Sequence, residues 1–68
     1  MKLIRLVINL STQSAADLNA IAARRGITRT EALRRALLTY RFLLKEQHEG
    51  RTIRTVKRGR KARELELL

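Results

Sequence analysis

Three side chains near the start of the chain, Arg5, Val7 and Asn9, have types and a spacing suited to contacting DNA bases. On a β-strand, residues two apart point to the same face, so these three would form a row. Arginine can donate two hydrogen bonds to guanine, asparagine can pair with adenine, and valine can contact the methyl group of thymine. The simpler alternative is a solvated strand face that opposes aggregation, but this leaves the exposed Val7 unexplained.

The segment that carries these residues reads as a strand or as a helix. With a period of two, the other face of residues 2–10 is aliphatic and holds Ile4, Leu6, Ile8 and Leu10. With a helical period, Lys2, Arg5 and Asn9 form one polar stripe, so periodicity alone does not decide. The short run and its β-branched residues favour a strand.

Two helices follow, and both have recognisable ends. Ser11 can cap a helix that runs to about Arg25, and Gly26 supplies the left-handed residue that ends it. The segment from Thr28 to Glu31 has the T-x-x-E pattern of a capping box, which predicts a second helix that ends at Gly50. The apolar positions of this second helix recur at helical spacing; they are Leu33, Ala36, Leu37, Tyr40 and Leu44.

The start of the second helix is a candidate phosphate site. Its first backbone N–H groups, on Arg29 and Thr30 beside the cap Thr28, have no partner within the helix, and the helix dipole favours an anion there. Ordinary helix-start chemistry is compatible with this function.

The tail from Arg51 carries seven basic and two acidic residues, and so a net charge of +5. It is compatible with a β-hairpin turning near Arg58 and Gly59, or with a basic arm. A hairpin could also cover Leu38 and Phe42. The run Lys57–Lys61 resembles the core of an AT-hook without its prolines, although general attraction to phosphates is the simpler interpretation. Further candidate DNA contacts are Lys2, Leu3, Arg58 and Arg60.

Composition limits the class of protein. The chain has 68 residues, a net charge of +10, no cysteine and one histidine. This excludes disulfides and thiolate metal sites, fits a cytoplasmic protein, and offers no catalytic constellation, metal site or cofactor-binding loop. No segment is long and apolar enough to span a membrane. The positive charge favours a polyanionic partner, nucleic acid first.

A chain of this size needs support to fold, and a second copy is the simplest source. A lone N-terminal strand cannot satisfy its own backbone groups, so we expect it to pair antiparallel with the same strand of another copy across a two-fold axis. Such a ribbon fits the major groove of DNA. The expected dimer core comprises Ile4, Leu6, Ile8, Leu10, Leu18, Leu33, Leu37 and Tyr40.

Residues 2–48, in particular Arg5–Ser11, Leu18, Ala22, Gly26 and Thr28–Arg34, resemble ribbon-helix-helix proteins such as the Arc and methionine repressors. The resemblance implies a mostly α fold with one N-terminal β-strand and an intertwined homodimer. It also implies base contacts by Arg5, Val7 and Asn9 and a phosphate contact at the start of the second helix.

We therefore expect a DNA-binding and dimerisation domain over residues 1–50 and a basic tail over 51–68. The expected function is sequence-specific binding of double-stranded DNA by a bacterial or phage transcriptional repressor. One alternative is an antitoxin whose tail binds a toxin protein. Another is a membrane-surface peptide that uses residues 2–10 as an amphipathic helix.

Overall fold

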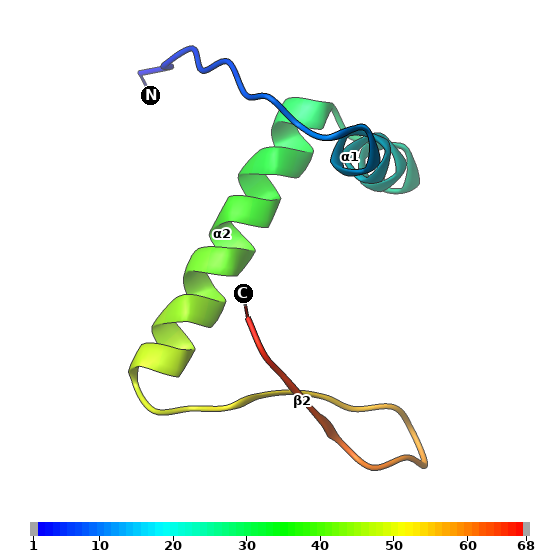
Figure 1. Cartoon of the computed structure of the whole chain (residues 1–68), viewed down its shortest axis with the longest axis vertical. Helices are drawn as coiled ribbons and strands as arrows, with labels where there is room; N and C mark the ends of the chain where they lie inside the picture. Colours follow the sequence, from blue (N-terminus) through cyan, green and yellow to red (C-terminus); the bar gives the residue numbers. More distant parts are fainter. Residues whose placement is uncertain (1, 68) are drawn as a thin grey trace. The chain divides into compact units, whose positions relative to one another are not determined.

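A computed structural model describes residues 2–67 and shows a mostly helical chain that ends in a small sheet (Figure 1). Helix α1 spans Thr12–Arg25 and helix α2 spans Arg29–His48. Strands β1 (Ile53–Thr55) and β2 (Arg63–Leu65) form a two-stranded antiparallel sheet. The chain divides into two compact units, with the division inside α2 between Arg34 and Arg35.

Helix α1 begins where the sequence predicts. Ser11 has the extended backbone of a cap residue, with φ −62° and ψ 161°. Its side-chain oxygen accepts a hydrogen bond from the backbone N–H of Ser14 at 3.1 Å, and its carbonyl accepts one from the N–H of Ala15 at 2.9 Å. The cap thus satisfies one of the first-turn donors that the helix itself leaves without a partner.

Helix α1 ends in a Schellman motif. Gly26 takes the left-handed conformation, with φ 65°, and its N–H donates to the carbonyl of Ala23. The N–H of Ile27 donates to the carbonyl of Ala22 at 3.0 Å. Both bonds satisfy carbonyls of the last turn, and they reverse the chain toward α2. The predicted role of Gly26 is confirmed.

Helix α2 has the predicted cap at Thr28. The side-chain oxygen of this residue accepts from the N–H of Glu31 at 3.0 Å, and its carbonyl accepts from the N–H of Ala32 at 2.9 Å. At the other end, Gly50 has φ 84° and donates to the carbonyl of Gln47, while the N–H of Arg51 donates to the carbonyl of Glu46. Both helices therefore end in the same motif.

The tail forms a β-hairpin, which is one of the two alternatives that the sequence left open; the other was a basic arm. Ile53 lies opposite Leu65, Arg54 opposite Glu64, and Thr55 opposite Arg63. In the connecting loop the N–H of Arg60 donates to the carbonyl of Lys57 at 2.9 Å. This bond closes a turn at the predicted place.

Two predictions differ from the observed structure of the single chain. Residues 2–11 contain neither a strand nor a helix, although the sequence favours a strand over 2–10. A strand is defined by hydrogen bonds to a neighbouring strand, and residues 2–67 supply no such neighbour for this segment. The hairpin leaves Leu38 and Phe42 exposed, so the expected cover for these two side chains is not provided.

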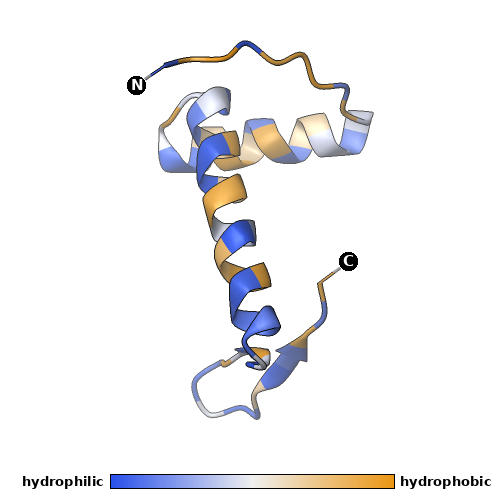
Figure 2. Cartoon of the chain, turned by 90° about the vertical axis from the view of Figure 1, so that its left-hand side faces the viewer, coloured by the Kyte–Doolittle hydropathy of each residue, from blue (hydrophilic) through white to orange (hydrophobic). Residues whose placement is uncertain are grey.

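The described chain has very little interior. Ala22 and Ala32 are its only buried hydrophobic residues, with 6% and 3% of their surface exposed. Much of the apolar colour in Figure 2 therefore belongs to residues that face solvent. Burying two alanines provides little hydrophobic stabilisation for a chain of this length. Among residues 2–67, neither helix is long and apolar enough to cross a membrane.

Candidate nucleic-acid interface

The opening segment presents its side chains to solvent. Arg5, Val7 and Asn9 are all exposed, and so are Lys2 and Leu3. The three candidate base-contacting residues therefore lie on one accessible stretch directly before the cap of α1. Residues 2–11 form no strand in the single chain, so the structure does not bring these three side chains onto one strand face.

The aliphatic residues of the same segment are also exposed. Ile4 retains 77% of its accessible surface and Leu6 retains 75%, while Ile8 and Leu10 are less exposed. Several exposed apolar side chains so close along one segment are typical of an interaction surface. Of the other predicted dimer-core residues, Leu18 and Leu33 are half-buried, whereas Leu37 and Tyr40 are exposed.

The start of α2 leaves backbone donors that could bind an anion. Thr28 uses its side-chain oxygen as an acceptor for the cap, and its hydroxyl hydrogen can still be donated. The N–H groups of Arg29 and Thr30 precede the first intrahelical bond, which Ala32 makes. Thr28, Arg29 and Thr30 are all exposed, so this end of the helix is accessible to a phosphate.

An ion pair lies one turn further along α2. Arg34 donates two hydrogen bonds to the carboxylate of Glu31, at 2.9 and 2.6 Å. These bonds, and the attraction between the two charges, raise the pKa of Arg34. Arg34 thereby offsets the negative charge of Glu31, which would otherwise repel a phosphate at the helix start.

A second ion-pair group lies where α2 joins the tail. Arg51 donates to Glu49 at 2.7 Å and to Glu46 at 3.0 Å, and these carboxylates raise the pKa of Arg51. The guanidinium is thus engaged by the chain itself. Among the described residues of the tail, Arg51 is the cation that ion pairs hold within the chain.

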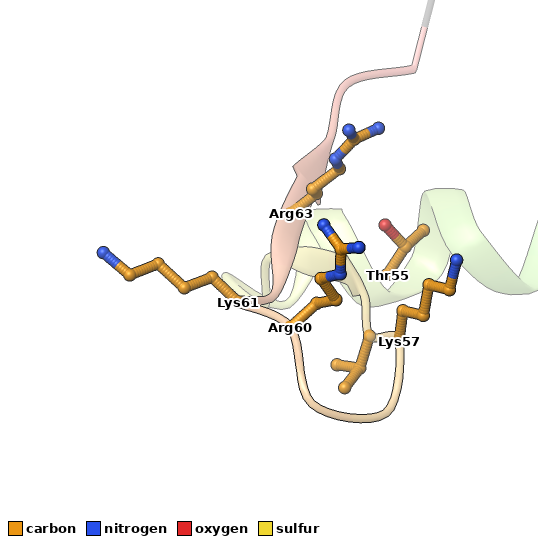
Figure 3. Close-up of a pocket in the computed structure, with 6 residues that line it drawn as sticks. Thr55, Lys57, Arg60, Lys61 and Arg63 are labelled. Carbon is orange, nitrogen blue, oxygen red and sulfur yellow. The ribbon is translucent and has the colours of Figure 1, made fainter.

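The hairpin carries a cluster of cations around a hollow, unlike the ion pairs of Arg34 and Arg51. An open hollow of about 470 Å³ lies at its looped end. Figure 3 shows the charged ends of Lys57, Arg60 and Arg63 on the same side of the ribbon as Thr55, whereas Lys61 extends away from them. The hollow is lined by Thr55, Val56, Lys57, Arg60, Lys61 and Arg63.

Sequence reasoning identified this site only in part. Arg60, one of the candidate DNA contacts, lines the hollow, whereas Arg58 does not. Thr55 and Arg63 were not among the candidates, and they come together because they are directly opposite in the hairpin. The signal that could have found them is the turn at Gly59, since folding the tail about that residue places positions 55 and 63 side by side.

No group of three or more metal-ligating side chains occurs within residues 2–67. Comparison of the chain with models of protein families, with curated proteins and with solved structures gives no significant match.

Proposed function

We propose that this chain is a homodimeric, sequence-specific DNA-binding protein of the ribbon-helix-helix type that regulates transcription. One observation carries the proposal. The opening segment is non-helical, and in it the exposed Arg5, Val7 and Asn9 alternate with exposed aliphatic residues. This segment leads directly into two capped helices joined by a turn. This arrangement lacks only a partner strand to become a ribbon.

The dimer supplies that strand. Two copies of residues 2–10 pair antiparallel, so each satisfies the backbone groups of the other. One face of the ribbon then buries Ile4, Leu6, Ile8 and Leu10 of both copies against the helices. Because Ala22 and Ala32 are the only buried hydrophobic residues among residues 2–67, this second source of apolar burial is what a stable fold requires.

The opposite face of the ribbon reads DNA. A two-stranded ribbon fits the major groove, and Arg5, Val7 and Asn9 appear on it twice, related by the two-fold axis. The start of α2, at Thr28, Arg29 and Thr30, holds a backbone phosphate and fixes the register of the ribbon on the duplex. The net charge of +10 per chain attracts the protein to DNA of any sequence.

The test is selection of binding sites from random duplexes at two salt concentrations. We expect enrichment of a palindromic site, because the two-fold axis of the dimer imposes its symmetry on the sequence that it reads. The variant Asn9→Ala should enrich a site with weaker preference at two symmetric positions. The matched control is Asn19→Ala, which makes the same substitution at an exposed position of α1 and should leave the consensus unchanged.

Two results would overturn the proposal. One is the absence of any enriched sequence although the protein binds DNA, which would indicate attraction by charge alone. The other is an enriched site without two-fold symmetry from a protein that sediments as a monomer.

A further inference from the structure

The two faces of the hairpin differ in charge. The register places Thr55 opposite Arg63, and Arg54 opposite Glu64. Since residues directly opposite in an antiparallel pair share a face, Arg63 and Thr55 lie on one face and Arg54 faces a carboxylate on the other. The face of Thr55 and Arg63 therefore has no acidic side chain at these paired positions, whereas the opposite face carries Glu64.

The looped end adds two cations to the face of Thr55 and Arg63. Lys57 and Arg60 extend to the same side as Arg63, around the open hollow (Figure 3). Within the described part of the chain, the side chains of these three residues have no hydrogen bond or ion pair, in contrast to Arg34 and Arg51. Three unpaired cations and one hydroxyl surround the hollow. The cations repel one another, and an oxyanion bound among them would relieve this repulsion.

We infer that this hollow, the hairpin clamp, binds a phosphate group of the DNA backbone. The inference rests on the proposed function, because it takes as its ligand the DNA that the dimer reads. Arg60 and Arg63 supply charge-assisted hydrogen bonds, Lys57 supplies a third positive charge, and the hydroxyl of Thr55 supplies a neutral donor. The contact positions the protein without reading sequence, as phosphate contacts generally do.

The conformation of the loop favours a phosphate contact over insertion in the minor groove. Gly59 has φ 75° and Arg58 has negative φ, and the bond from Arg60 to Lys57 closes the turn around them, as in a type II turn. The backbones of the two strands of a hairpin lie about 4.8 Å apart, and their side chains add to this width. The minor groove is about 6 Å wide, so it admits a single extended chain but not this turn. The resemblance of Lys57–Lys61 to an AT-hook therefore does not extend to its conformation.

The experiment compares two double variants of the full chain that lose the same charge. Arg60→Gln with Arg63→Gln removes one loop arginine and one strand arginine from the hollow. Arg58→Gln with Arg54→Gln removes one loop arginine and one strand arginine that do not line it. Affinity is measured over a range of salt concentrations on the selected site and on a random duplex of the same length.

We expect the first variant to bind both duplexes more weakly. The slope of log K against log salt should become shallower by about 2 for the dimer, because each phosphate contact contributes about 0.9 and the dimer has two hairpins. The control variant should change the slope much less, because neither Arg54 nor Arg58 lines the hollow. Exchange of A·T for G·C pairs in the flanks should have no effect on the loss.

Three outcomes would overturn the inference. Equal losses in the two variants would show a diffuse charge effect, and no loss in either would show that the hairpin does not contact DNA. A loss confined to duplexes with A·T flanks would indicate the minor groove. Circular dichroism and sedimentation of both variants check that fold and assembly are retained. If the unchanged protein selects no sequence, the proposed function fails, whereas the hairpin clamp is still decided on the random duplex.

Discussion

The side-chain oxygen of Thr28 accepts a hydrogen bond from the backbone N–H of Glu31 at 3.0 Å, and this bond fixes the first turn of α2. The same hydroxyl has a hydrogen left to donate, and the exposed residues Arg29 and Thr30 follow it directly along the chain. Helix capping and the proposed phosphate binding would therefore depend on one side chain.

Replacing Thr28 should affect stability and binding together. We expect Thr28→Ala to lower the free energy of unfolding by about 1 kcal/mol, because the N–H of Glu31 loses its acceptor. Affinity should fall by a similar factor on selected and random duplexes, since a phosphate contact carries no sequence information. Urea denaturation and equilibrium binding measure the two effects. The control Thr28→Ser keeps the hydroxyl and should retain both, and a loss confined to the selected site would contradict the phosphate role.

Gly26 should be sensitive to substitution for a purely local reason. Its φ is 65°, and nothing lies within 4 Å of the position that a β-carbon would take, so strain in the backbone is the only penalty. We expect Gly26→Ala to destabilise the fold by about 1 kcal/mol. Gly26→Asn should lose less, because asparagine tolerates the left-handed region better. Equal stability of Gly26→Ala and the unchanged protein in urea would show that this turn is not held in the native state.

Neighbouring residues of the opening segment should have opposite roles. Leu6 and Val7 are both highly exposed in the single chain, but the proposed ribbon buries only Leu6. We expect Leu6→Asn to weaken the dimer, because its amide would be buried without a partner, and to lower the melting temperature in a manner that depends on protein concentration. Val7→Asn should leave assembly intact and alter only DNA binding. Sedimentation across a dilution series distinguishes the two, and equal dissociation of both variants would count against the strand register.

Arg5 should contribute to specificity and not to folding. We expect Arg5→Ala to weaken binding to the selected site by about 1–3 kcal/mol, the usual discrimination of one base contact, with a smaller loss on random DNA. Thermal stability should be nearly unchanged because the side chain is exposed. Arg41→Ala, which removes an exposed arginine from α2, is the control for charge. Equal loss on both duplexes would show that Arg5 contacts only the backbone.

The helices were predictable because their signals are local. The four residues at the helix ends each form hydrogen bonds to groups within five residues along the chain; they are Ser11, Gly26, Thr28 and Gly50. Residue type and spacing therefore suffice to place the start and the end of both helices. The turn near Gly59 is local in the same sense. The strand expected over residues 2–10 is different, because its hydrogen bonds require a neighbouring strand, which the described part of the chain does not provide.

The amino-acid sequence by itself determined the limits of α1 and α2. It also predicted the place of a turn in the tail, although it left a hairpin and a basic arm open as alternatives. Only the folded tail decided that Thr55, Lys57, Arg60 and Arg63 share one hollow while Arg54 faces Glu64. The physical reason is the range of the interactions. Caps and turns are formed by residues that are close along the chain, whereas the grouping of cations depends on the register of two strands eight or more residues apart.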